Sequence, residues 1–146
     1  MPSPSDKFIF FNCGKWEKRK GHDLLIFLFQ EAFKNESDVE LWMMCHNVHL
    51  SPEQEAQWEN LYKQDPRVRL IGRVQSQQEV ASIMNTVDCG VFPSRAEGWN
   101  LEILELMAAG KHIITTNYSA HTEFCNAKNS MLVTPLKNEP AHDGIF

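Results

Sequence analysis

Residues 89–116 read CGVFPSRAEGWNLEILELMAAGKHIITT and hold the pattern that decides the fold. Cys89–Phe92 is a short apolar run, which predicts a buried strand. Asn100–Ala109 has apolar residues at helical spacing and stops at Gly110, a residue type that often follows the last turn of a helix. His112–Thr116 is a second apolar run. A strand, a helix and a strand in this order predict two parallel strands joined by a helical crossover.

The same alternation of strands and helices continues towards both ends of the chain. Further apolar runs predict strands over residues 7–13, 39–45, 68–71 and 130–133. Helical spacing and capping residues predict helices over residues 22–34, 51–63, 77–85 and 120–124. The strands are short continuous apolar runs, which are typical of parallel sheets covered by helices on both faces. The sequence therefore predicts an α/β fold with a doubly wound, mainly parallel, six-stranded Rossmann-like sheet.

Length and composition indicate one globular domain. The chain has 146 residues, of which 42% are hydrophobic and 23% charged, values that are ordinary for a soluble domain with its own core. Residues 1–6, in which prolines and serines alternate, predict a linker, and residues 7–146 predict a single domain. No apolar run is long enough to cross a membrane, and a secretory signal is not expected. A cytoplasmic protein is therefore expected.

Charge and cysteine usage argue against several other classes of protein. A net charge of −5 argues against a nucleic-acid-binding protein, which normally needs a basic face. The four cysteines form no C-x-x-C pair and the six histidines are scattered, so no metal site is expected. The dinucleotide motif G-x-G-x-x-G, the P-loop and the G-x-S-x-G elbow are also missing. Because ligands of doubly wound folds lie at the carboxyl ends of the strands, the candidate site residues are expected in the loops there.

A basic loop, Gly14–Gly21, follows the first predicted strand with the sequence GKWEKRKG. Lys15 and Lys20 lie at its two ends and are placed to converge on one anion. A diphosphate suits this place, because the start of the next helix adds a positive field of its own. Lys18 and Arg19 are interpreted as surface charges. The alternative interpretation of the whole loop is a solvated basic segment without a ligand.

An acidic segment follows the fourth predicted strand, in the loop and helix of residues 93–105. Glu97 lies just ahead of the helix. Glu105 comes seven residues after the last loop glycine, almost two helical turns, so it is predicted on the same face. A nucleotide sugar spans the distance between two such carboxylates, each of which accepts hydrogen bonds from sugar hydroxyls. The backbone amides predicted to bind an anion there belong to Gly98, Trp99, Asn100 and Leu101.

Three further interpretations concern this region. Leu101, Leu104 and Ala108 are predicted as the buried stripe of the helix, with Glu105 beside it and partly buried. Glu102 is the rival carboxylate, and the sequence leaves open which of Glu102 and Glu105 is the surface residue. Trp99 fits either a packing aromatic or a ligand contact.

A third polar segment, Tyr118–Glu123, follows the fifth predicted strand. Ser119 is expected to cap the short helix that begins there. His121 and Glu123 would form a catalytic pair only with a nucleophile, and none is spaced for it.

With these segments in view, the chain resembles the C-terminal, donor-binding domain of a retaining glycosyltransferase of family 4, which has the GT-B fold of two Rossmann-like domains. The basic loop is similar to the G-R…K-G loop of that family, with Lys15 where arginine is usual. Residues 93–110 are similar to its P-S-x-x-E-G-x-x-x-x-x-L-E-A-M-A-x-G segment, in which Glu97 and Glu105 form the E-x7-E pair. The resemblance runs from about residue 8 to residue 133.

The resemblance implies transfer of a sugar from a nucleoside diphosphate sugar, a UDP-sugar or a GDP-sugar, with retention of anomeric configuration and without a metal or other cofactor. It implies that Lys15 and Lys20 hold the diphosphate, that Glu97 contacts the donor sugar and that Glu105 contacts the ribose. Backbone groups near Arg73 and Val74 would meet the base. The donor-binding residues so implied are Gly14, Arg73, Val74, Ser94, Gly98, Trp99, Asn100, Leu101 and Glu105.

The chain departs from the family pattern at both ends. The acceptor-binding N-terminal domain is missing, and the chain ends before the closing helix that usually follows. We therefore expect a fragment of a longer enzyme, inactive by itself, that meets a membrane surface only through the rest of that enzyme. One alternative is a nucleotide-sugar binding or regulatory module without catalysis. Another, a receiver-like interaction domain, would need acidic residues after the first strand, where this chain is basic.

Overall fold

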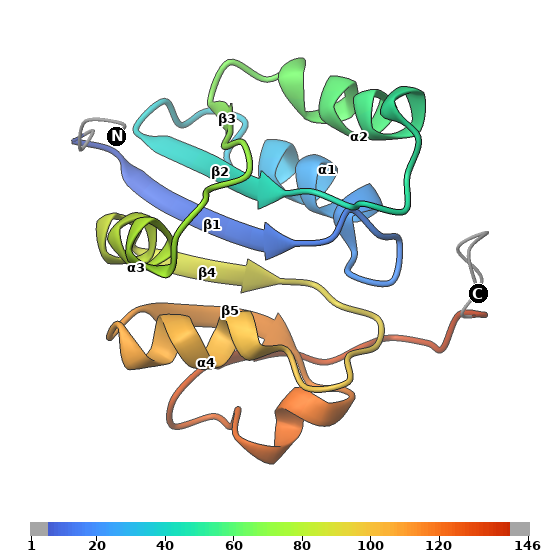
Figure 1. Cartoon of the computed structure of the whole chain (residues 1–146). Coiled ribbons are helices and arrows are strands. Elements are labelled where there is room, and N and C mark those ends of the chain that lie inside the picture. Colours follow the sequence, from blue (N-terminus) through green and yellow to red (C-terminus); the bar gives the residue numbers. More distant parts are fainter. Residues whose placement is uncertain (1–5, 141–146) are drawn as a thin grey trace.

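A computed structural model describes residues 6–140 of the chain, so the predicted linker lies outside the described residues except for Asp6. Six strands form one sheet in the order β3-β2-β1-β4-β5-β6 (Figure 1). Every neighbouring pair is parallel. The doubly wound Rossmann-like fold is confirmed, and the sheet is parallel throughout its described strands. These are β1 (Phe8–Gly14), β2 (Val39–Cys45), β3 (Val68–Leu70), β4 (Cys89–Phe92), β5 (His112–Thr116) and β6 (Met131–Val133).

The helices lie in the connections between the strands, close to their predicted ranges. Two of them begin with a capping box, at Ser51, where the sequence predicts an N-cap, and at Ser76, where it predicts the capping box itself. None of the described helices has both the length and the apolar character needed to cross a membrane. They are α1 (His22–Ala32), α2 (Pro52–Lys63), α3 (Gln77–Thr86), α4 (Leu101–Ala108) and the 3-10 helix η1 (Ala120–Glu123).

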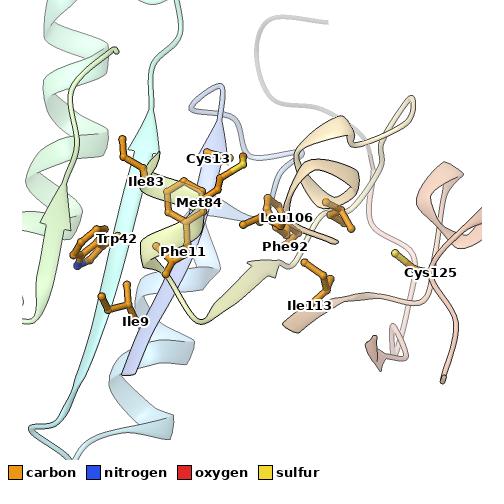
Figure 2. Packing of buried hydrophobic residues seen from close by; sticks show 12 residues of the cluster. Ile9, Phe11, Cys13, Trp42, Ile83, Met84, Phe92, Leu106, Ile113 and Cys125 are labelled. Carbon is orange, nitrogen blue, oxygen red and sulfur yellow. The ribbon is translucent and has the colours of Figure 1, made fainter. Parts of the chain in front are cut away.

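Each face of the sheet is covered by its own pair of helices. On one face α1 and α2 bury a cluster against the strands that includes Trp16, Leu25, Phe29, Leu41 and Tyr62. On the other face α3 and α4 bury a second cluster, shown in Figure 2, that includes Phe11, Trp42, Met84, Phe92 and Leu106. Burial on both faces explains why the strands are apolar along their whole length.

The buried side of α4 differs from the predicted stripe. Leu101 and Ala108 are exposed, and Ile103 and Leu106 are buried instead. Leu106 packs directly onto β4, because a Cβ atom at Gly90 would lie 2.6 Å from its Cδ1 atom. The missing side chain of this strand residue therefore decides which side of α4 faces the sheet.

The order of the strands reverses between β1 and β4, so the connections after these two strands diverge from one place. There the loops after β1 and β4 are joined by a hydrogen bond from the Arg95 amide to the Arg19 carbonyl, 2.7 Å long. Gly21 has a φ of 77°, and a Cβ atom on it would lie 2.2 Å from the carbonyl oxygen of Pro93. This close contact places the basic loop against the acidic one, at the point where doubly wound folds bind ligands.

Candidate functional site

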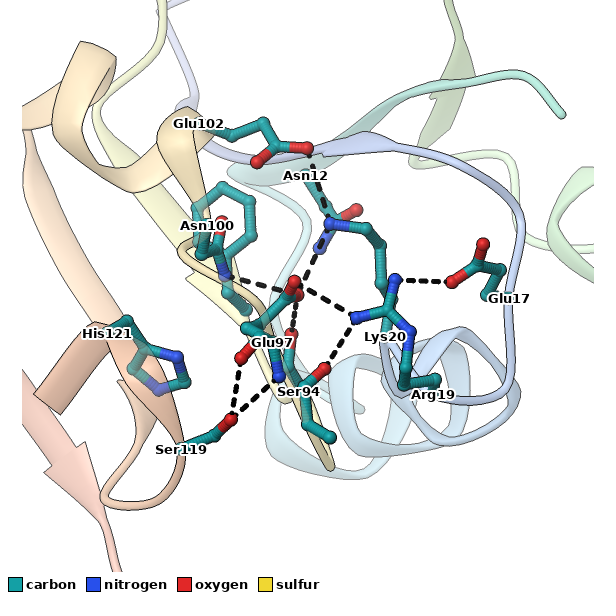
Figure 3. Close-up of polar contacts among 12 residues, drawn as sticks. Asn12, Glu17, Arg19, Lys20, Ser94, Glu97, Asn100, Glu102, Ser119 and His121 are labelled. Carbon is teal, nitrogen blue, oxygen red and sulfur yellow. Dashed lines mark hydrogen bonds and ion pairs between the residues drawn. The ribbon is translucent and has the colours of Figure 1, made fainter. Parts of the chain in front are cut away.

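Two cations and three carboxylates meet where the loops after β1 and β4 come together (Figure 3). The Nζ atom of Lys20 lies 3.2 Å from an oxygen of Glu97 and 3.2 Å from an oxygen of Glu102. Arg19 binds Glu17 at 2.5 Å and Glu97 at 3.1 Å. The prediction that Arg19 is a surface charge is therefore wrong: the turn after β1 directs its side chain towards the loop after β4. We call these five residues the charge network.

Lys20 is buried, with 8% of its side chain exposed. Burial by itself lowers the pKa of Lys20, but the carboxylates of Glu102 and Glu97 outweigh it and raise the pKa above its ordinary value. Lys20 is therefore charged at neutral pH. Lys15, the other cation predicted to hold an anion, is exposed, and among the described residues it makes no hydrogen bond or ion pair. Lys18 is exposed, as predicted.

Glu97 is fixed in place by its own loop and by the segment after β5. The hydroxyl of Ser94 and the side-chain amide of Asn100 donate hydrogen bonds to its Oε1 atom, at 2.7 and 3.3 Å. The Ser119 hydroxyl accepts from the backbone N–H of Glu97 at 2.8 Å and donates to its carbonyl at 2.9 Å. The sequence predicts that the Ser119 side chain caps η1, but in the structure it makes no such cap hydrogen bond. Its φ of 76° turns its side chain back onto the loop after β4.

Behind the charge network, a buried histidine holds the start of the basic loop. The Nδ1 atom of His22 accepts a hydrogen bond from the backbone of Glu17 at 3.2 Å, and its Nε2 atom lies 2.9 Å from Oδ1 of Asn12. This pairing requires the proton on Nε2, donated to Asn12. Burial, and then the charges of Lys20 and Arg19, lower the pKa of His22 to about 3. Nothing in the spacing of the sequence singles out this residue, so it is absent from the predicted site residues.

We expect the stability of the protein to fall as the pH drops below about 6.5, partly because of His22. The unfolded chain takes up a proton near that pH, whereas the folded protein takes it up only near a pKa of about 3. The free energy of unfolding then decreases by about 2 kcal/mol at roughly pH 5. Urea unfolding across this range should show a smaller pH slope for His22→Gln. His49→Gln, at an exposed position, should keep the slope, and an unchanged slope in His22→Gln would mean that His22 is not held neutral.

Next to the charge network lies a cavity of about 370 Å³. Its polar rim includes Gly14, Arg73, Glu102 and Glu105, and its apolar wall includes Val74 together with Met44, Ile71, Val80 and Met84. The structure thus brings together four of the predicted donor-binding residues, Gly14, Arg73, Val74 and Glu105. Glu105 is exposed rather than partly buried. Glu102 is not on an open solvent face, since it lines this cavity and binds Lys20.

The loop ahead of α4 has backbone donors that are not used by the described part of the chain. Within residues 6–140, the N–H groups of Gly98, Trp99 and Asn100 have no hydrogen-bond partner in the chain. A Cβ atom at Gly98 would meet no atom within 4 Å. Trp99 is 46% exposed and packs on Phe124, with 5.4 Å between ring centroids. Leu101 is 59% exposed, so its predicted contribution is limited to its backbone position at the start of α4.

In the described part of the chain there is no metal centre, and the predicted partners His121 and Glu123 do not form a pair. No group of three or more His, Cys, Asp or Glu side chains is placed to hold a metal ion among residues 6–140. His121 is buried, and its Nε2 atom contacts Thr115 and the carbonyl of Thr116 at 3.2 and 2.6 Å. Glu123 is exposed on η1, so the two side chains point to different surroundings.

Comparison with known proteins agrees with this geometry. The family model described as glycosyl transferases group 1 matches residues 7–143. A search of curated protein sequences gives no significant match. The chain is similar to the C-terminal domain of a glycosyl transferase group 1 family protein (LpcC) from Francisella tularensis, with a TM-score of 0.75 and 25% identity over 92% of this chain and 70% of that one.

Two longer proteins share the fold at lower sequence identity. Anabaena Alr3699/HepE, solved in complex with UDP-glucose, has a TM-score of 0.75 and 17% identity, covering 90% of this chain and 36% of that one. A glycosyltransferase from Rickettsia africae has a TM-score of 0.76 and 19% identity, covering 92% and 35%. The chain thus spans about a third of these two proteins. On the evidence of the family match and of the six-stranded parallel sheet, this chain belongs to the glycosyl transferases group 1 family and has the Rossmann-like fold of a GT-B C-terminal domain.

Proposed function

We propose that this chain is the donor-binding domain of a retaining glycosyltransferase and that it binds a nucleoside diphosphate sugar. The observation that carries the proposal is the pairing of Lys20 with Glu97 beside the cavity that Arg73 and Glu105 line. It lies at the reversal point of the strand order, where doubly wound folds bind nucleotides. The UDP-glucose complex of the Anabaena neighbour favours a UDP-sugar as the donor.

In this proposal the cavity binds the nucleoside, and the charge network binds the diphosphate and the donor sugar. The base is proposed to lie at Arg73 and Val74, on the apolar wall, and the ribose hydroxyls at the carboxylate of Glu105. The diphosphate would meet Lys20, and the exposed side chain of Lys15 is free to close over it. Glu97, held in one position by three neighbours, would receive the hydroxyls of the donor sugar.

Catalysis is proposed to depend on stabilising the diphosphate leaving group. As the bond to the sugar breaks, negative charge develops on the diphosphate, and fixed cations and amides already aimed at it lower the barrier. Lys20 and the N–H groups of residues 98–100 are placed for this. We propose that the transfer needs no metal or other cofactor and that the domain binds no nucleic acid. We assign residues 7–146 to one donor-binding domain, and its four free thiols fit a cytoplasmic protein.

The acceptor is proposed to bind to another part of a longer enzyme. Active sites of this kind lie between two domains, and the chain matches only about a third of two glycosyltransferases of known structure. The 146 residues alone should therefore bind UDP and release no sugar to an acceptor. Calorimetric titration with UDP, with uridine as the control without phosphates, tests the binding half of the proposal. Absence of any heat of UDP binding would overturn it.

Glu105→Gln is expected to weaken UDP binding by about ten- to a hundredfold, because a carboxylate that accepts from two ribose hydroxyls contributes charged hydrogen bonds. A 2′,3′-dideoxy analogue should bind the unchanged protein poorly and lose little more on Glu105→Gln, since both changes delete one contact. Glu123→Gln, at an exposed position, is the matched control. If the losses in binding free energy from the dideoxy analogue and from Glu105→Gln are fully additive, the ribose does not bind at Glu105.

A further inference from the structure

Glu102 differs from the other two carboxylates of the charge network. The side chains of Glu17 and Glu97 are 5% and 4% exposed, and Glu97 accepts two further hydrogen bonds from its own loop. Glu102 is 26% exposed, and Lys20 is its one side-chain partner among residues 6–140. Within the same range Glu17 likewise has one side-chain partner, Arg19, but it is buried, so Glu102 is the partly exposed carboxylate of the network that can leave with the loss of a single contact.

The charge network carries more negative than positive charge. Arg19 and Lys20 face the carboxylates of Glu17, Glu97 and Glu102, which leaves one net negative charge. A nucleoside diphosphate brings at least two more negative charges to the same place. Charges of one sign repel strongly at short range in a partly buried site. The network as it stands therefore opposes the ligand that Lys20 is proposed to bind.

The carboxylate of Glu102 also lies where a bound anion would be stabilised. Glu102 lies in the first turn of α4, where the helix dipole stabilises negative charge. Its carboxylate is turned towards Nζ of Lys20 (Figure 3), and the residue lines the cavity that Glu105 also lines. A phosphate oxygen on Lys20 would compete with this carboxylate for the same ammonium group.

We propose that Glu102 is a displaceable counter-ion, which binds Lys20 when no nucleotide is present and thereby lowers the affinity for the diphosphate. This inference rests on the proposed function of the site. When a nucleotide binds, a phosphate oxygen takes the place of Glu102 on Lys20, and the carboxylate turns towards the open side of the cavity. Lys20, Glu97 and Glu105 are proposed to raise the affinity for the donor. Glu102 lowers it, and it lowers the affinity for the released nucleoside diphosphate as well.

The test is calorimetric titration of the full chain with UDP at neutral pH and constant ionic strength. Glu102→Gln keeps the shape of the side chain and removes its charge, and we expect it to lower the Kd for UDP by about fivefold or more. Glu31→Gln makes the same change of charge on the exposed side of α1 and should change the Kd by less than about twofold. In a Lys20→Met background most of the gain should vanish, because the competition acts through Lys20.

An unchanged or higher Kd in Glu102→Gln would overturn the inference. Glu102→Ser serves as a second variant should the glutamine protein be unstable, and the same direction is expected for it. If the unchanged protein binds UDP and Lys20→Met weakens that binding, while both Glu102 variants leave the Kd as it was, the counter-ion role fails and the proposed function stands. If neither the unchanged protein nor the Glu102 variants bind UDP, both fail.

Discussion

Gly21→Ala is expected to destabilise the protein by about 3–5 kcal/mol, one of the largest effects of any single methyl group in this chain. The φ of 77° at Gly21 is costly for alanine, and the added Cβ atom would lie 2.2 Å from the carbonyl oxygen of Pro93. Because that oxygen belongs to backbone, no side chain can rotate away, and the loops after β1 and β4 must move apart. Urea unfolding monitored by circular dichroism measures the loss.

Gly72→Ala is the matched control for this prediction. A Cβ atom at Gly72 meets nothing within 4 Å, and the residue has no positive φ, so its effect on stability should stay below about 0.5 kcal/mol. Gly98 also has open space around it, but there the proposed ligand would fill it. Gly98→Ala should therefore leave stability unchanged and weaken UDP binding. Equal stabilities for the Gly21 and Gly72 variants would show that the two loops are not held together as described.

The fold was accessible from the sequence because each element carries its own local signal. Short apolar runs alternate with helices whose starts are marked by Ser51 and Ser76, and these two capping boxes are present in the structure. The buried side of α4 was not accessible in this way. In the run Leu101–Ala108 too many positions are apolar for periodicity to choose one side, and the choice depends on Gly90 of the neighbouring strand.

The candidate site was accessible only in part. Placement at the ends of β1 and β4 was enough to select Lys20 and Glu97, which the structure brings within 3.2 Å. The sequence does not show in which direction the side chains of a loop turn. Arg19 was therefore taken for a surface charge and Glu102 was left open as a rival carboxylate, although both belong to the charge network. His22 was missed because its partners, Asn12 and the backbone of Glu17, are set by the turn of the chain.

Lys20→Met is expected to weaken UDP binding by about a hundredfold or more. A charge-assisted hydrogen bond to phosphate is worth about 1.5–3 kcal/mol, which alone corresponds to about ten- to a hundredfold. The loss grows because the fixed carboxylate of Glu97 then faces the diphosphate without the ammonium group that lies 3.2 Å from it. Methionine keeps the length and apolar stem of the side chain, so the change isolates the charge.

Lys18→Met is the matched control, since it removes one positive charge from the same loop at an exposed position. It should change the Kd for UDP by less than about twofold, because an exposed charge is screened by water and salt. Raising the ionic strength measures the contribution of the diffuse surface field, which salt screens. This field is nearly the same in both variants, so added salt should weaken their UDP binding by similar factors. Equal losses from Lys18→Met and Lys20→Met would mean that a diffuse surface field attracts the nucleotide, and the buried ammonium group between Glu97 and Glu102 would then have no special part in holding the diphosphate.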